Sequence, residues 1–310
     1  MKHFLYRIVC TIALFILIPV VFTFLIQGSG EDSIQNMEFL PSTETAGDTG
    51  LDEGILPGIL ANEISMNTET EAIKAQAVIV RTNCLLAVER GESLPEGLTK
   101  GEMIRLWGQD SFSEYYSLLE SCVEDTKGVA MVCGGTYIRA DFHRCSAGYT
   151  RNASEVYENE EFPYLKSVDG RMDLTSEDFL KVIFYTPQQL VEKGGELFSE
   201  ETRAAASSLT AADLLGKIVI NQRDQAGYVT EIAVDGAVHS GEEIRLLYGW
   251  NSSAFSLKEV DGEIRVLSKG LGHGLGASLY GANQLAKDGF SYKDILKYFY
   301  SEIEFVTRYD

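Results

Sequence analysis

The sequence predicts an α+β protein in which helices pack with an antiparallel sheet and a single transmembrane helix precedes the folded part. Three observations support this: an uncharged apolar run near the N-terminus, helical periodicity over residues 69–90, and strand-like alternation after residue 217. Helical and strand patterns are segregated along the chain, which favours α+β over alternating βαβ units. Hydrophobic residues make up 45% of the 310 residues and charged residues 23%, which is typical of a folded chain.

The N-terminal apolar run covers residues 8–26, nineteen residues without a charge, and is long enough to cross a bilayer as a helix. Lys2 and Arg7 precede the run and acidic residues follow it, so the N-terminus is expected in the cytoplasm. A cleaved signal peptide is the alternative, but the run exceeds the usual apolar region of such peptides, and no small-residue cleavage site follows it. We therefore expect residues 1–27 to form a cytoplasmic tip and a single-pass membrane anchor.

The chain is strongly acidic, with 46 Asp and Glu against 26 Lys and Arg and a net charge of −20. This balance argues against a nucleic-acid partner, because binding to phosphates depends on a basic surface. It also argues against docking on an anionic lipid surface. Residues 28–54 are polar, acidic and poor in periodic apolar positions, so we expect a flexible stalk there. A folded extracytoplasmic domain is expected over residues 55–305.

The clearest helix of this domain is predicted over residues 69–90. Thr68 and Glu71 have the spacing of a capping box, and Gly91 is a typical C-terminal stop. Between these ends, apolar residues recur at helical spacing and predict a buried stripe.

A second helix is expected near 111–125, short β-prone segments at 129–140 and 145–157, and mostly helix over 176–216, with Pro187 opening one helix. Apolar and polar residues then alternate between turns such as Asp235-Gly236, which predicts an antiparallel sheet. Its expected strands are 217–222, 228–234, 243–247, 254–260 and 263–267, the last two joined across Asp261-Gly262.

Glu63 is a candidate general acid because it lies in the apolar run Gly58–Ile64 (GILANEI). Partial burial disfavours the charged carboxylate and raises its pKa, so the group could protonate a leaving group near neutral pH. An exposed loop glutamate is the other interpretation. Spacing alone does not distinguish Glu63 from the other acids of the chain.

Two longer blocks carry a family resemblance. Residues Ile59–Asn83 read ILANEISMNTETEAIKAQAVIVRTN, and residues Leu271–Phe299 begin LGHGLGASLYGANQLA. They resemble the opening and closing motifs of the stage II sporulation protein D family, and three blocks between them follow the order of that family: DFHRCSAGYT, FPYLKSVD and the segment from Gly227 to Phe255. The resemblance covers about residues 55–300. It implies a membrane-anchored lytic transglycosylase that cuts the MurNAc–GlcNAc bond of stem-peptide-free peptidoglycan during forespore engulfment.

The resemblance also implies roles for individual residues. Glu63 corresponds to the catalytic acid of the family. Substrate-binding positions are Lys74 and Arg81 on the first helix, Tyr164 and Lys166 in FPYLK, and His273 in the glycine-rich closing block. From the residues alone, Lys74 and Arg81 could instead form a solvated helix face or a salt bridge to Glu71.

One carboxyl group is enough for the implied reaction. A hydrolase usually needs two carboxylates, one for the leaving group and one for the nucleophile or water. A transglycosylase can use one Glu first as acid and then as base, because the C6 hydroxyl of muramic acid attacks its own C1. The product is a 1,6-anhydro sugar.

No cofactor is required for this chemistry, although Cys145 and His143 are a candidate zinc pair. Some relatives hold zinc near the catalytic Glu with this Cys and a His five residues later, where this chain has Thr150. A third ligand is not identifiable, which argues against zinc. A buried thiol and a hydrogen-bonded histidine are the other interpretation of the pair. Disulfides among Cys84, Cys122, Cys133 and Cys145 are allowed in the expected compartment, but their pairing cannot be derived.

The expected partners are glycan strands, a cell-wall amidase and other engulfment membrane proteins at the sporulation septum. Two further classes of function stay open at this point. A non-catalytic peptidoglycan-binding amidase enhancer would not need an acid in an apolar setting. A zinc hydrolase of stem peptides is disfavoured by the missing ligand set.

Overall fold

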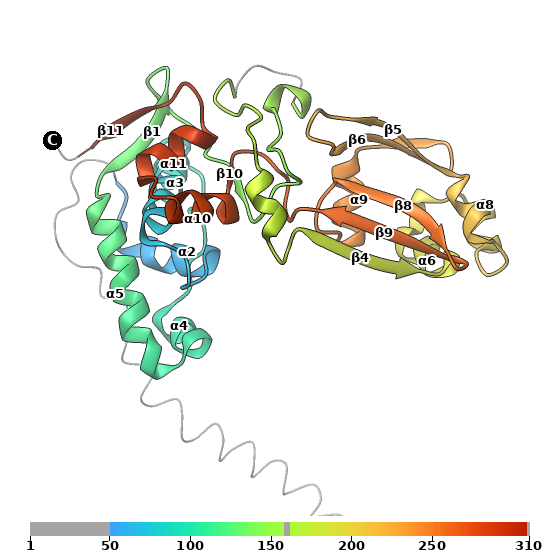
Figure 1. The fold of residues 1–310 in the computed structure, drawn as a ribbon, viewed down its shortest axis with the longest axis horizontal. Helices are drawn as coiled ribbons and strands as arrows, with labels where there is room; N and C mark the ends of the chain where they lie inside the picture. Colours follow the sequence, from blue (N-terminus) through green and yellow to red (C-terminus); the bar gives the residue numbers. More distant parts are fainter. Residues whose placement is uncertain (1–49, 158–161, 309–310) are drawn as a thin grey trace, which may run out of the picture.

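The computed structural model describes residues 50–157 and 162–308, which form two regions side by side (Figure 1). The helical region (residues 50–140 and 277–308) combines the N-terminal helices with the returning C-terminal helices. The sheet region (residues 180–269) lies at the other end, and residues 141–179 and 270–276 link the two. The expected anchor lies outside the described residues. None of the described helices is both long and apolar enough to cross a bilayer.

The central element of the helical region is α3 (Thr70–Arg90), which contacts α2 (Leu56–Glu63), α5 (Gln109–Asp125), α10 (Leu279–Lys287) and α11 (Tyr292–Phe299). The predicted helix 69–90 is confirmed. Fourteen of its 21 residues are buried. A single apolar stripe cannot account for so many, and the helix is buried on several sides because these four helices pack around it.

The two ends of α3 differ in how well the sequence predicts them. Gly91 ends the helix in the left-handed conformation (φ 68°), as expected. The expected capping box at the start is absent, because the N-cap residue is Glu69, whose side chain makes no capping hydrogen bond. The Glu71 carboxylate instead accepts a hydrogen bond from the backbone N–H of Tyr292 in α11.

The helical region begins earlier than expected. Leu51 is fully buried, and Glu53 starts a short 3₁₀ helix, Glu53–Ile55, that packs beside α2. Residues 51–54 are therefore part of the folded domain and not of a flexible stalk. Helix α4 (Lys100–Trp107) precedes α5. Helix α5 confirms the helix expected near 111–125. Strands β11 (Glu304–Thr307), β1 (Val129–Cys133) and β2 (Thr136–Tyr137) form a small antiparallel sheet in that order.

The sheet region contains two antiparallel three-stranded sheets. One has the order β4 (Leu180–Tyr185), β9 (Glu263–Lys269), β8 (Phe255–Val260), and the other the order β5 (Ile218–Arg223), β6 (Val229–Val234), β7 (Ala237–His239). Helices α6 (Pro187–Gly194), α8 (Ala211–Leu215) and α9 (Gly241–Tyr248) pack with them, and α7 (Glu200–Ala205) contacts α6. The hairpins at Asp235-Gly236 and Asp261-Gly262 are confirmed, with positive φ at all four residues.

Two predictions in this region are wrong. Residues 243–247 were expected as a strand but belong to α9, which Ser240 and Glu243 open with a capping box and Gly249 closes in the left-handed conformation. Residues 180–185 form strand β4 inside a segment expected to be mostly helical, although Pro187 does open a helix. A short apolar run fits both the helical and the strand period, so the capping and turn residues at its ends decide between helix and strand.

The linking residues bring the block DFHRCSAGYT beside the closing block. Strand β3 (Phe142–His143) pairs in parallel with β10 (Ala277–Ser278), and Cys145 bridges to Leu271. At Gly276 (φ +68°) the backbone approaches the Asp141 carbonyl so closely that no side chain would fit. A buried ion pair of 2.6 Å between Arg151 Nε and Asp224 Oδ2 ties the link to the sheet region.

Candidate active site

Glu63 is the last residue of α2, at the point where two cavities meet. Buried Ile59, Leu60 and Ala61 fix this end of the helix in the core, while the Glu63 side chain stays half-buried. The larger cavity has a volume of about 440 Å³ and the smaller one about 370 Å³. Both are lined by Glu63, Arg144 and Leu279, so they adjoin at these residues, and we call the two cavities together the groove.

The two cavities have different walls. The larger one lies between α3, which contributes Ala72, Ala75, Gln76 and Ile79, and α10, together with Thr175–Asp178. The smaller one lies between the two regions of the molecule. Its lining comes from the β3 residues, the glycine-rich segment around His273, and the end of α9 from Arg245 to Asn251.

Burial raises the pKa of the Glu63 carboxyl, and the positive charge of Arg144 opposes this in part. A raised pKa keeps more of the carboxyl protonated near neutral pH, as a general acid requires. Arg144 itself is exposed and forms no ion pair with any residue of the described ranges. Sequence reasoning overlooked it, although it is the only Lys or Arg in the block DFHRCSAGYT.

Two histidines line the smaller cavity, with ring centroids 5.9 Å apart. His273, expected in the site, is half-buried there, and its Nδ1 accepts a hydrogen bond from the Leu275 N–H at 3.1 Å. His143 Nδ1 lies 3.0 Å from the Leu275 carbonyl, so it carries the proton. Burial, and then the charge of His273, lower the pKa of His143 to about 3. His143 is therefore neutral, and its buried Nε2 has no partner within the described chain.

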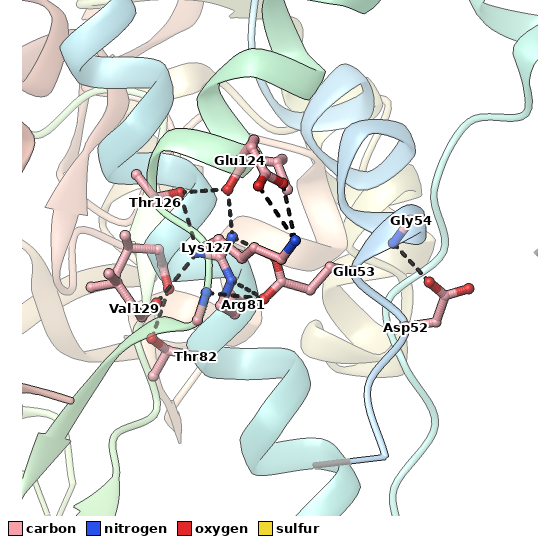
Figure 2. Close-up of polar contacts among 12 residues, drawn as sticks. Asp52, Glu53, Gly54, Arg81, Thr82, Glu124, Thr126, Lys127 and Val129 are labelled. Carbon is pink, nitrogen blue, oxygen red and sulfur yellow. Dashed lines mark hydrogen bonds and ion pairs between the residues drawn. The ribbon is translucent and has the colours of Figure 1, made fainter. Parts of the chain in front are cut away.

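Arg81 lies in the core, away from both cavities, so we correct its expected role in substrate binding to a structural one (Figure 2). Its guanidinium is fully buried and binds both carboxylate oxygens of Glu53, at 2.7 and 2.9 Å. It also donates to the carbonyls of Val123 and Val129 and to the Thr126 hydroxyl. This network joins the start of the domain to α3 and to the end of α5.

The other three expected substrate-binding residues also lie outside the cavities. Lys74 forms ion pairs with Glu71 at 3.1 Å and Asp125 at 3.0 Å, which matches the salt-bridge alternative. Tyr164 is buried, and its hydroxyl accepts a hydrogen bond from the Arg139 N–H. Lys166 is exposed and contacts the Thr150 hydroxyl through its backbone carbonyl.

The zinc pair lacks a third ligand in the structure as well. No three His, Cys, Asp or Glu side chains within residues 50–157 and 162–308 are grouped to hold a metal ion. Cys145 is buried and lies 3.6 Å from the Ser146 carbonyl and 3.7 Å from the Asp173 carbonyl, and burial raises its pKa to about 12. The two side chains alone do not make up a zinc site, which takes three or four protein ligands. The four cysteines of the described chain are free thiols.

Known proteins of similar sequence show which family this chain belongs to. The sequence profile of a family described as "Stage II sporulation protein" matches residues 50–133. The chain is 30% identical over 261 residues to stage II sporulation protein D of Bacillus amyloliquefaciens, covering 80% of this chain and 72% of the relative. It is 31% identical to stage II sporulation protein D of Bacillus subtilis (strain 168), covering 78% and 71%.

A protein of Bacillus subtilis named amidase enhancer is a further relative. It is 25% identical over 289 residues, covering 79% of this chain and 39% of that protein. The motifs, the groove at Glu63 and these relatives agree, and the chain belongs to the stage II sporulation protein D family.

Proposed function

We propose that this chain is a lytic transglycosylase that cuts the MurNAc–GlcNAc bond of peptidoglycan. One observation carries the proposal: a half-buried carboxyl group with a raised pKa lies where two cavities meet. A glycan strand that lies along this groove would place sugars on both sides of Glu63. A binding module has no need of a proton donor in this position.

In the proposed reaction, protonated Glu63 donates its proton to the glycosidic oxygen as the C1–O bond of muramic acid breaks. The resulting carboxylate then accepts the proton of the C6 hydroxyl while that oxygen attacks C1. The 1,6-anhydro ring closes, and Glu63 is protonated again for the next cycle. Burial favours the protonated acid, which the first half-reaction needs. Arg144 favours the carboxylate, which the second half-reaction needs.

Hydrolysis is a second candidate, because Glu177 and Asp178 also line the larger cavity. A hydrolase would use such a second carboxylate to activate water or as the nucleophile. The two reactions give different products. Anhydromuramic ends indicate the transglycosylase, and reducing ends indicate the hydrolase.

Replacement of Glu63 by Gln tests the proposal. The amide keeps the volume of the side chain but has no proton to transfer, so we expect product formation to fall by about 10²–10⁴-fold. The Glu177→Gln variant removes an exposed acid from the same cavity and should cleave at the wild-type rate. Anhydro product is measured by mass spectrometry of stem-peptide-free strands, and strand binding by pull-down.

The outcomes separate the alternatives. A Glu63→Gln protein that cleaves near the wild-type rate contradicts the proposed role of Glu63. Loss of activity in Glu177→Gln together with reducing ends favours the hydrolase. If wild type binds glycan without cleaving it but stimulates an amidase, the chain acts as the name of its amidase-enhancer relative says.

We further propose that the protein works from the cell membrane during engulfment, with a cell-wall amidase and other engulfment membrane proteins as partners. An amidase supplies the stem-peptide-free strands that the reaction uses. The anchor rests on the uncharged run 8–26. It is tested by whether the full chain stays with the membrane after a high-salt wash while residues 28–310 alone are soluble.

A further inference from the structure

Gln76 is an unusual residue of α3. Its side chain is 1% exposed, yet neither its amide oxygen nor its amide nitrogen has a hydrogen-bond partner among the described residues. Asn83 on the same helix shows the ordinary arrangement, since its amide donates to the Ala140 carbonyl at 3.0 Å and accepts from the Ala140 N–H at 2.8 Å. Arg81 and Thr82, also buried in α3, have partners as well.

A buried amide without partners is unfavourable, because it loses its hydrogen bonds to water and gains none in return. Buried polar groups in folded proteins almost always have a partner, so an exception calls for an explanation such as a missing ligand. Gln76 lines the larger cavity beside Glu63, in the groove assigned to the glycan. Its position in the helix is therefore consistent with a partner that arrives with the substrate.

The surroundings of Gln76 define the chemistry of that partner. The lining of this cavity includes Ala72, Ala75, Ile79, Ala282 and Leu296, which are small or apolar, as well as polar residues such as Asn283 and Gln284. A glutamine side chain offers one acceptor and two donors, so it can pair with a second amide in both directions. An acetamido group supplies an N–H, a carbonyl oxygen and a methyl group for the apolar wall.

We infer that the larger cavity binds the acetamido group of an N-acetylglucosamine unit, with Gln76 as its hydrogen-bonding partner. The identity of the sugar rests on the proposed function, in which the substrate alternates GlcNAc and MurNAc. The charges select GlcNAc for this side: besides the shared Glu63 and Arg144, the larger cavity has Glu177, Asp178 and Lys287, whereas the smaller has Arg245. The lactyl carboxylate of muramic acid is therefore better placed on the arginine side, which leaves the larger cavity to GlcNAc, the leaving sugar of the proposed reaction.

The test compares two strands and three proteins. The strands are stem-peptide-free glycan with N-acetylated glucosamine and the same glycan after de-N-acetylation of its glucosamine. The proteins are wild type, Gln76→Met, which keeps the side-chain volume, and Asn83→Leu as the matched control. Binding is measured in the Glu63→Gln background and cleavage with Glu63 intact, so each property has its own readout.

We expect wild type to bind and cleave the acetylated strand about tenfold better, which corresponds to the loss of one to two hydrogen bonds. Gln76→Met should bind and cleave both strands equally well, as strongly as wild type binds and cleaves the de-N-acetylated strand. Its melting temperature should equal or exceed that of wild type. Asn83→Leu should melt at a lower temperature and keep the preference for acetylated glycan.

Two results would overturn the inference: equal treatment of both strands by wild type, or an unchanged preference in Gln76→Met. If Gln76→Met does not fold, the comparison of the two strands with the wild-type protein still tests whether the acetamido group is recognised. A preference in binding without any anhydro product supports the acetamido site and contradicts the proposed reaction.

Discussion

The Arg81 network and the groove at Glu63 are two polar regions of the same helical core, and their hydrogen bonds are satisfied in opposite ways. Around Arg81, each guanidinium nitrogen donates to a carboxylate, hydroxyl or carbonyl oxygen. In the groove, the amide of Gln76 and His143 Nε2 have no partner in the described chain. This contrast shows that a charged residue in a family motif can serve the fold, and it fits the inference that Gln76 pairs with a ligand in the groove.

The largest expected effect concerns the Arg81 network. Arg81→Met removes the guanidinium that binds both oxygens of the largely buried Glu53 carboxylate, and we expect the free energy of unfolding to fall by about 3–5 kcal/mol. Denaturant unfolding measures the loss. Glycan binding by the protein that remains folded should be unchanged, because Arg81 lines neither cavity.

The double variant Glu53→Gln/Arg81→Met is the control for that experiment. It removes both charges, so it should recover much of the lost stability. A folded Arg81→Met protein of normal stability that no longer binds glycan would reverse our assignment and return Arg81 to the substrate site.

The next largest effect concerns Arg144 in the groove. Arg144→Gln removes the charge that lowers the pKa of Glu63, so this pKa should rise further. Cleavage needs protonated Glu63, and the decline of kcat/KM with rising pH should therefore move to higher pH. Arg144→Lys keeps the charge and should keep the wild-type profile. An unchanged profile in Arg144→Gln would mean that Arg144 does not act on the acid.

A smaller effect links Glu63 to stability. Its folded-state pKa lies above the value of 4.5 for an unperturbed Glu, so the folded state holds the proton more tightly than the unfolded state. Stability should therefore fall as pH rises from about this value through the folded-state pKa, and stay lower above it. Glu63→Gln should lack this decline and be at least as stable as wild type at neutral pH. Urea unfolding between pH 4 and pH 8 measures the difference.

The smallest effect is expected for Lys74. Its ion pairs with Glu71 and Asp125 are partly exposed, with side-chain exposures of 18%, 35% and 51%. Exposed pairs of this kind contribute about 0–1 kcal/mol, so Lys74→Met should change stability by no more than that. Cleavage should be unchanged. A large loss of cleavage in a stable Lys74→Met protein would show that the groove extends to this residue.

Several helix ends and turns follow from the sequence alone, and the motifs also single out the residue that we propose as the acid. Gly91, Pro187 and the Asp-Gly pairs mark ends and turns that depend only on neighbouring residues, and the structure has all of them. The motif blocks singled out Glu63 and His273, which both lie in the groove. Local signals work because backbone conformation and capping are set within about one turn of the chain.

Which polar residues line the groove depends on the tertiary structure. Arg81 and Gln76 lie five residues apart in one motif, but their surroundings come from distant parts of the chain. Glu53, 28 residues before Arg81, binds the arginine. Helix α10, some two hundred residues after Gln76, supplies the opposite wall of the cavity that Gln76 lines. Arg144 likewise meets Glu63 only because its segment, after strand β3, is held beside β10. Burial and partners are properties of these distant contacts, and no spacing within a single motif contains them.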